Sequence, residues 1–338
     1  MISVSVVIPV YNGEKWIIKC LDSIAAQDIE CEIIVIDDGS TDNTLSICNL
    51  WAEKHLYTKV ITQENSGVSK ARNRGIEEAT AEWITFIDAD DCFLDNAFEV
   101  LSKEQAKDAQ IILAGYTTDE DYKGDFYTLK TIPHDILSCG VVEFARYEKR
   151  INKIALVDNY NNWACWGKFF RREFLINNNI RFPVGVALTE DAVFCFHAYN
   201  MAKKILATRQ IIYYYRRTGE SVTSHYHPNL LENNEKIIFA MEKIRKELSI
   251  QDKWEKEAST FYARLIVQSC VESLKRVSSE VELQININRL KNICEKEQIQ
   301  KALKNTSYLY LIPGNKNKIL YIPILFRLKN KKYKEALL

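Results

Sequence analysis

The chain has 338 residues, of which 47% are hydrophobic and 27% are charged, and its 45 basic and 45 acidic side chains give a formal net charge of zero. This composition is that of a globular protein long enough for two cores, and it argues against wholesale binding of nucleic acid. The sequence also shows no signal peptide and no apolar run near the roughly 20 residues of a membrane helix. The nine cysteines are scattered, so buried free thiols in a reducing cytoplasm are expected.

The first part of the chain alternates between strand and helix patterns. Apolar, β-branched runs predict strands at residues 4–10, 33–36, 60–61 and 83–87. Periodic segments predict helices at residues 14–27, from 45 onwards and around 71–79. Such alternation implies parallel strands joined by right-handed crossovers, so the turns after the strands emerge at one edge. The side chains expected to converge there are Asn12, Glu14, Asp37, Asp38, Asn65 and Asp88.

Three carboxylates, Asp88, Asp90 and Asp91, follow the fourth strand directly. Like charges this close repel one another and favour a cation between them. Ligand sets made only of oxygen favour Mg²⁺ or Mn²⁺ over zinc. The alternative is an acidic turn that caps a helix beginning near Asp95.

The later chain is less regular. Its pattern predicts a helix at 96–109, a strand at 111–116, a loop at 117–135, weak helical character at 137–150, a short helix at 173–178, a helix from 191 and a strand at 211–215. Residues 229–303 lack Gly and Pro and are periodic at helical spacing, which predicts a separate helical module. The tail from Asn305 carries seven basic residues against one acid. We therefore expect two domains, at residues 1–228 and 229–338.

Four ordered segments resemble family 2 glycosyltransferases of the GT-A fold. They read VSVVIPVYNGEKWIIKCLDSIAAQ, IIVIDDGSTDNT, NSGVSKARNRGI and FIDADD, and the resemblance is dense over residues 4–92 and looser to about residue 225. It implies an α/β fold with a Rossmann-like, mostly parallel sheet. It also implies inverting, metal-dependent transfer of one sugar from a nucleotide donor, UDP-hexose or UDP-N-acetylhexosamine, to a hydroxyl of a glycan acceptor in bacterial surface polysaccharide synthesis. The Q-x-x-R-W signature of processive synthases is absent, which favours a distributive enzyme.

The resemblance also implies which residues contact the nucleotide sugar. These are Pro9, Tyr11, Glu14, Asp38, Asn65, Gly67, Arg72, Asp88, Ala89, Asp90, Arg217 and Ser221. Asp38 would accept a hydrogen bond from uracil, and the alternative is an Asx-type turn. Arg72 would face the anionic donor or lie on a solvated helix face.

The same resemblance assigns the metal and the base. Mn²⁺ or Mg²⁺ would be held by Asp90, with Asp88 and His225 as further ligands. Asp191 in Thr189-Glu190-Asp191 would take the proton of the acceptor hydroxyl, and the alternative is an ordinary helix N-cap. Trp163 and Trp166 would form a floor for a sugar ring or would be buried core residues.

Two other classes of protein stay open at this point. A catalytically silent nucleotide- or glycan-binding subunit could share the fold, but it would have no need of Asp90 and Asp191. A nucleotidyltransferase usually carries a Gly-rich loop with Lys or Arg after the first strand, which Tyr11-Asn12-Gly13-Glu14 is not. The basic tail suggests peripheral contact with the inner face of an anionic membrane, and the alternative is a solvated helix face.

Overall fold

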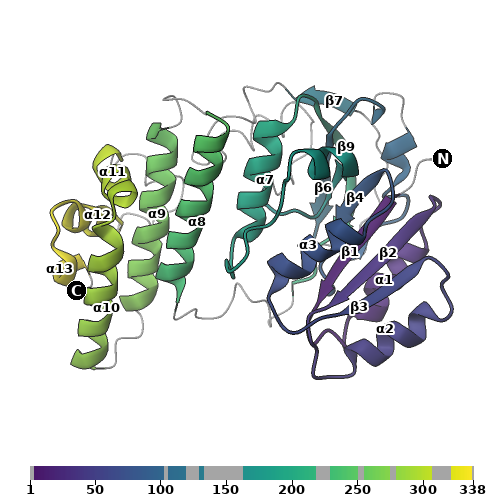
Figure 1. The fold of residues 1–338 in the computed structure, drawn as a ribbon, viewed down its shortest axis with the longest axis horizontal. Coiled ribbons are helices and arrows are strands. Elements are labelled where there is room, and N and C mark those ends of the chain that lie inside the picture. Colours follow the sequence, from purple (N-terminus) through teal and green to yellow (C-terminus); the bar gives the residue numbers. More distant parts are fainter. Residues whose placement is uncertain are drawn as a thin grey trace. The chain divides into compact units, whose positions relative to one another are not determined.

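The computed structural model describes residues 4–102, 106–118, 129–132, 163–217, 229–249, 255–274, 279–306 and 321–336. The described residues up to Arg217 form one compact unit, and those from Asn229 onwards form a second (Figure 1). The predicted domain boundary at residue 228 and the weak helix at 137–150 lie outside the described residues.

A mixed sheet forms the framework of the first unit. Its described strands are β1 (Val4–Val10), β2 (Cys31–Asp37), β3 (Thr58–Thr62), β4 (Trp83–Phe86), β5 (Cys92–Phe93), β6 (Ile111–Thr117), β7 (Leu129–Ile132), β8 (Lys168–Arg171) and β9 (Ile205–Tyr214). They follow the order β3-β2-β1-β4-β8-β6-β9-β5, and β7 pairs with β9. Strands β1 to β4 are parallel, as predicted, whereas β8 runs antiparallel to both β4 and β6.

Three helices connect the parallel strands. They are α1 (Ile17–Ala25), α2 (Thr44–Ala52) and α3 (Val68–Glu78). The chain steps from β1 to β2 and β3 in one direction and returns to β4 on the other side of β1. Because the crossovers are right-handed, α1 and α2 cover one face of the sheet and α3 covers the other (Figure 1). Ligands of such sheets bind where the strand order reverses, which is between β1 and β4.

The chain between β4 and β6 differs from its prediction. The helix expected at 96–109 is wrong in the described residues, which form only a 3₁₀ turn at Glu99–Ser102. Asn96 has a φ of 58°, which interrupts helical backbone, and the Ala97 N–H donates to the Gln27 side chain instead of a carbonyl of its own turn. The loop expected at 117–135 contains the strand β7.

Helices α6 (Arg172–Asn177) and α7 (Glu190–Met201) complete the described part of the first unit. Aromatic side chains fix α7 over the sheet, because Phe194 stacks on Phe182 at 4.0 Å and meets Phe86 of β4 edge-on at 5.6 Å. All three rings are buried. This packing holds the start of α7 near the carboxyl end of β4.

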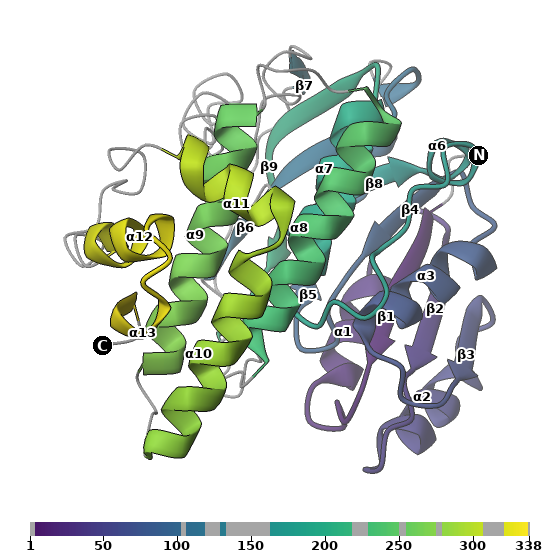
Figure 2. The same cartoon turned by 60° about the vertical axis from the view of Figure 1, so that its left-hand side comes forward.

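The second unit is helical, as predicted for residues 229–303. Its described helices are α8 (Leu230–Glu247), α9 (Glu255–Leu274), α10 (Glu280–Cys294), α11 (Glu297–Asn305), α12 (Tyr321–Lys329) and α13 (Tyr333–Ala336) (Figure 2). Pro323 lies in the first turn of α12, where a missing N–H is tolerated. Ile324 and Leu328 are buried, so α12 packs into the module. Within the described residues no helix is both long and apolar enough to cross a membrane.

The described cysteines are free thiols, as predicted, and Cys31 and Cys92 are only half-buried.

Candidate active site

The loops after β1 and β2 are joined by hydrogen bonds. The Asn12 N–H donates to Ser40 Oγ at 2.9 Å, and Asn12 Oδ1 accepts from the Thr41 N–H at 2.8 Å. Glu14 Oε2 accepts from the backbone N–H and from Nδ2 of Asn43 at 3.0 and 2.8 Å. Asn43 is the residue that precedes α2, so Glu14 stabilises the start of that helix. The nucleotide contact of Glu14 stays a prediction.

Asp38 and Asp37 have different partners. Asp38 accepts three hydrogen bonds of 2.7–2.9 Å from the loop after β3. The donors are Gln63 Nε2 and the backbone N–H groups of Ser66 and Gly67. The Asx-type contact belongs to Asp37, whose Oδ1 accepts from the Ser40 N–H at 3.3 Å. Asp38 therefore fixes the loop that carries Asn65 and Gly67.

The other predicted nucleotide residues lie around the same strand ends. Pro9 is buried within β1, Tyr11 follows it with 51% of its surface exposed, and Asn65 is exposed. Gly67 has a φ of 88°, a conformation that favours glycine, and it precedes α3. Ala89 is half-buried.

Among the three carboxylates after β4, Asp90 and Asp91 have different environments. Asp91 is 1% exposed and accepts from the Tyr213 hydroxyl at 2.6 Å and from the Arg216 N–H at 2.8 Å. Burial, and then the charges of Asp88 and Asp90, raise the pKa of Asp91. Asp90 is half-buried, and burial together with the charge of Asp88 raises its pKa to about 6. Asp91 is thus a structural residue. A bound cation would instead offset the burial and the charge repulsion that raise the pKa of Asp90.

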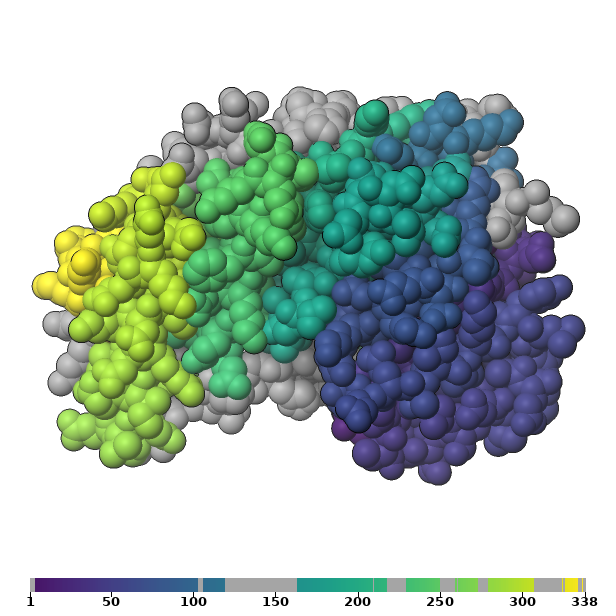
Figure 3. Space-filling model, viewed as in Figure 1, coloured from purple at the N-terminus to yellow at the C-terminus, as the bar shows by residue number. Residues whose placement is uncertain are grey.

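Arg72 connects the carboxylates of β4 with those of α7. Its Nη2 lies 2.8 Å from Asp88 Oδ1, and its Nη1 lies 2.7 Å from Glu190 Oε1 and 3.7 Å from Asp191 Oδ1. The guanidinium is buried and lies over the ring of Phe182 at 5.3 Å. The solvated helix face is wrong for Arg72, because its side chain is buried, and its contact with the donor stays a prediction. Figure 3 shows the blue segment that carries α3 against the teal segment that carries α7.

Asp191 does not occupy the capping position of α7. The residue that precedes α7 is Thr189, whose side chain makes no capping hydrogen bond, and Asp191 lies inside the first turn. The alternative of an N-cap at Asp191 is therefore wrong. Its carboxylate is half-buried, whereas its neighbour Glu190 is buried. Burial, and then the charge of Asp191, raise the pKa of Glu190.

Trp166 is a buried core residue, which was the alternative to a floor for a sugar ring. It is buried in a stack with Tyr213 at 4.5 Å and Tyr215 at 5.5 Å, so it belongs to the core. Trp163 is half-buried and Arg217 is exposed. Ser221 and His225 lie outside the described residues.

The donor set around Asp90 suits a divalent cation that also binds phosphate. Among the described residues no group of three or more His, Cys, Asp or Glu side chains is arranged to hold a metal ion. Mg²⁺ and its analogues are commonly held by one or two carboxylates together with substrate phosphates. Asp90 and Asp88 fit that requirement, although one oxygen of Asp88 already contacts Arg72.

Sequence reasoning missed two residues of this site. Glu190 was visible as the neighbour of Asp191, but nothing in its spacing indicated a pairing with Arg72, 118 residues away. Arg216 was overlooked in favour of Arg217, yet its Nε donates to the Asp90 carbonyl at 2.9 Å. No sequence signal distinguishes these two adjacent arginines.

The sheet, its reversal between β1 and β4, and the carboxylates at that edge have the architecture of the GT-A class of glycosyltransferases. The chain belongs to glycosyl transferase family 2, whose family model matches residues 5–185.

Similar proteins come from several bacteria. The glycosyltransferase GlyG of Streptococcus pneumoniae serotype 4 is 32% identical over 225 residues, which cover 65% of this chain and 72% of GlyG. EpsH of Bacillus subtilis (strain 168) is 27% identical over 307 residues, which cover 90% of this chain and 86% of EpsH. The crystal structure of Staphylococcus aureus TarS 1-349 with UDP-GlcNAc matches with a TM-score of 0.65 at 22% identity, covering 100% of this chain and 90% of that one. This last similarity shows the shared fold.

Proposed function

We propose that the chain transfers a single sugar, with inversion, from a UDP-linked hexose or N-acetylhexosamine to a hydroxyl of a glycan acceptor. The observation that carries this proposal is the contact of Arg72 with Asp88 on one side and with Glu190 and Asp191 on the other. Through Arg72, the carboxylate proposed to contact the nucleotide sugar, Asp88, lies close to the carboxylate proposed as general base, Asp191. The UDP-GlcNAc bound to TarS supports a UDP-linked donor.

The acceptor hydroxyl is a weak nucleophile at neutral pH and needs a general base. In the proposed reaction its oxygen attacks the anomeric carbon while Asp191 accepts its proton. The bond between that carbon and the phosphate oxygen breaks, and the electron pair leaves with UDP. One displacement inverts the anomeric centre and needs no covalent enzyme intermediate.

Asp90, with Asp88, would hold Mn²⁺ or Mg²⁺, which would supply a Lewis acid for the diphosphate leaving group. Arg72 would keep Asp88 and Asp191 in fixed positions, since its planar fork contacts both at once. Asp38 would accept the uracil hydrogen bond at the oxygen positions that its loop leaves open. Its loop contacts would then orient the carboxylate before the donor binds.

We propose a bacterial surface glycan or a lipid-linked glycan as the acceptor. TarS, which is 30% identical over 67% of this chain, is by name a poly(ribitol-phosphate) beta-N-acetylglucosaminyltransferase, and the alignment spans 38% of it. Its name supports an acceptor of this general kind. Contact of the tail with an anionic membrane stays a prediction.

The purified chain can be tested with a panel of UDP-, GDP- and TDP-linked sugars, with release of the nucleoside diphosphate as the readout. We expect release from a UDP-hexose or UDP-N-acetylhexosamine in Mn²⁺, and loss of that release in EDTA. Release from GDP- or TDP-sugars alone would overturn the donor assignment. Turnover that persists in EDTA would overturn the metal assignment.

A further inference from the structure

The turn between β4 and β5 carries Asp88 and Asp90, and its backbone is held by two side chains from much later in the sequence. The Asp88 N–H donates to the Tyr213 hydroxyl at 3.2 Å, and the Asp90 carbonyl accepts from Arg216 Nε at 2.9 Å. The Asp91 N–H closes the turn, because it donates to the Asp88 carbonyl at 3.0 Å. The main chain of both proposed metal ligands is therefore fixed by Tyr213 of β9 and by Arg216, which lies just beyond that strand.

The carboxylate of Asp91 connects these two residues. Its Oδ2 accepts from the Tyr213 hydroxyl at 2.6 Å, and its Oδ1 accepts from the Arg216 backbone N–H at 2.8 Å. All three residues are buried, with exposed fractions of 1% for Asp91, 0% for Tyr213 and 9% for Arg216. Asp91 has both oxygens engaged in this way, so it holds the turn and does not serve as a metal ligand.

Ring contacts keep the two partners of Asp91 in place. The Tyr213 ring stacks on Trp166 at 4.5 Å, and the guanidinium of Arg216 lies over the rings of Trp16 at 4.6 Å and of Tyr214 at 5.0 Å. A phenylalanine at position 213 would make the same stack. The hydroxyl of Tyr213 therefore serves its two hydrogen bonds, one accepted from Asp88 and one donated to Asp91.

The position of this turn matters for a metal that has few protein ligands. Mg²⁺ requires near-ideal octahedral geometry, and it is commonly held by one or two carboxylates together with substrate phosphates. Residues that orient metal ligands from behind typically contribute 10–100-fold to metal affinity. A small shift of the turn would move both Asp88 and Asp90.

We propose that Tyr213, Asp91 and Arg216 are positioning residues, which hold the turn with Asp88 and Asp90 in the geometry that binds Mn²⁺ or Mg²⁺ together with the donor diphosphate. None of the three needs to contact the metal itself. The inference rests on the proposed function only in taking Asp88 and Asp90 to be the metal ligands.

The test is the affinity of the full chain for Mn²⁺ at saturating UDP, measured by the electron paramagnetic resonance of free Mn²⁺. Tyr213→Phe removes the hydroxyl and keeps the ring, and it should weaken Mn²⁺ binding by about 10–100-fold. Some loss of melting temperature is also expected, because a buried hydrogen bond is removed.

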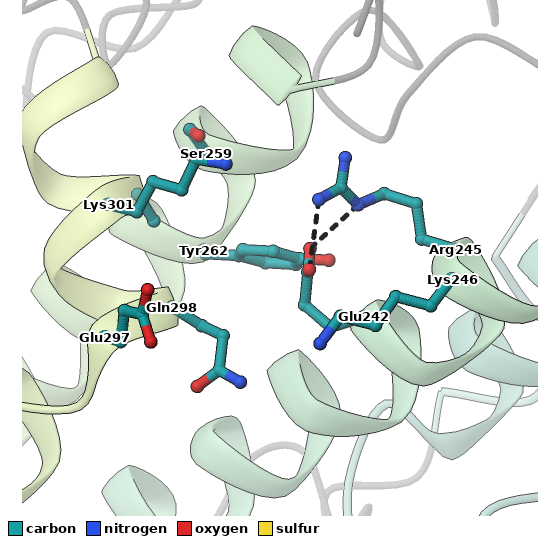
Figure 4. Close-up of a pocket in the computed structure, with 9 residues that line it drawn as sticks. Glu242, Arg245, Lys246, Ser259, Tyr262, Glu297, Gln298 and Lys301 are labelled. Atoms are coloured by element: carbon teal, nitrogen blue, oxygen red, sulfur yellow. Dashed lines mark hydrogen bonds and ion pairs between the residues drawn. The ribbon is translucent and has the colours of Figure 1, made fainter. Parts of the chain in front are cut away.

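Tyr262→Phe is the matched control for that loss of stability. Tyr262 is 4% exposed and lines a cavity of the helical unit, where its hydroxyl hydrogen-bonds Glu242, which is 8% exposed (Figure 4). This variant makes the same chemical change beside a buried carboxylate, so it should lower the melting temperature and leave Mn²⁺ affinity unchanged. If Tyr213→Phe likewise lowers only the melting temperature, the three residues merely stabilise the fold and the proposal is overturned.

Asp91→Asn separates positioning from charge. The carboxamide oxygen can accept from the Arg216 N–H, and its NH₂ group can donate to the Tyr213 hydroxyl, so the connection is kept while the charge is removed. Mn²⁺ affinity should fall less than in Tyr213→Phe. An equal or larger loss would show that Asp91 acts on the metal through its charge, which contradicts a positioning role.

The wild type distinguishes a failure of this inference from a failure of the proposed function. If the wild type takes up no Mn²⁺ with UDP, the metal assignment is wrong and the inference is wrong with it. If the wild type binds Mn²⁺ and Tyr213→Phe binds it equally well, the metal assignment stands and only the positioning role is refuted.

Discussion

The guanidinium of Arg72 is buried among carboxylates, so its removal has a large predicted effect. Arg72→Ala leaves Glu190 buried without its ion pair, and breaking a buried pair in this way costs about 3–5 kcal/mol. We expect the free energy of unfolding in urea to fall by about that amount and sugar transfer to be lost. Arg72→Lys should also lose transfer, because an ammonium cannot contact both sides with a planar fork.

Arg74 gives the matched control for this prediction. It lies on the same helix, is exposed, and pairs with Glu78 at 2.6 Å. Arg74→Ala should cost less than about 1 kcal/mol. Equal unfolding free energies for Arg72→Ala and Arg74→Ala would refute the structural role of Arg72.

Asp90 makes a pH-dependent contribution to the stability of the metal-free chain. Its pKa of about 6 lies above the ordinary value of 3.8, so the folded state binds more protons than the unfolded state between these values. This contribution is therefore complete below the ordinary pKa and is lost as the pH rises through about 6. Asp90→Asn should raise the free energy of unfolding at about pH 7 by roughly 1–3 kcal/mol and change it little at about pH 4.

The control here is Asp108, whose side chain is 87% exposed. Asp108→Asn should change stability little at either pH. If Asp90→Asn lowers stability at neutral pH without metal, the charge repulsion inferred for this cluster is absent.

At the scale of elements, α3 lies close to β1 because Gly75 has no side chain. A Cβ at this position would lie 2.2 Å from Val7 Cγ1, and Val7 is fully buried in the sheet. Gly75→Ala should therefore force α3 outward and destabilise the chain by about 1–3 kcal/mol. Thermal unfolding checks this prediction, and a rise in melting temperature would contradict it. Because Arg72 is one turn away, transfer should also fall.

The elements that sequence patterns predicted best are β1 to β4 and the helices between them. Their β-branched runs and helical periodicity are local signals, and parallel topology follows from their alternation. The position of β8 between β4 and β6 could not be predicted, since it depends on a pairing with residues far along the chain. The helix expected at 96–109 failed because Asn96 adopts positive φ, which the apolar periodicity does not encode.

In the candidate site, too, some features follow from local sequence patterns and topology, and others depend on residues far apart in the chain. That Asp38 and Asp88 follow parallel strands, which end at one edge of the sheet, was predictable from topology. The burial of the Asp91 side chain was not predictable, because its partners Tyr213 and Arg216 lie near the opposite end of the unit's sequence. The contact of Arg72 with Glu190 likewise requires the tertiary packing of α3 against α7.

At the scale of the whole molecule, two hypotheses concern the basic tail: it contacts an anionic membrane, or it is a solvated helix face. Lys331 and Lys332 are exposed, and Phe326 is 53% exposed, although α12 is packed through Leu328. Each basic residue near an anionic membrane contributes on the order of 1 kcal/mol. If the tail contacts such a membrane, the wild type should pellet with anionic vesicles at low salt, and Lys331→Glu/Lys332→Glu should pellet less.

Neutral vesicles and high salt are the controls for that experiment, since both remove the electrostatic attraction. Lys243→Glu, a change at an exposed lysine of α8, should pellet as the wild type does. Equal pelleting of wild type and tail variant would leave the solvated helix face as the correct description.

The proposed reaction depends on Asp191, which accepts the proton of the acceptor hydroxyl. The most direct measurement is the turnover of Asp191→Asn with the preferred UDP-sugar and acceptor, alongside its melting temperature and its affinity for UDP. Asn keeps the size of the side chain and removes its basicity. We expect turnover lower by about 10²–10⁴-fold, with melting temperature and UDP affinity close to those of the wild type. Turnover within a few-fold of the wild type would contradict it.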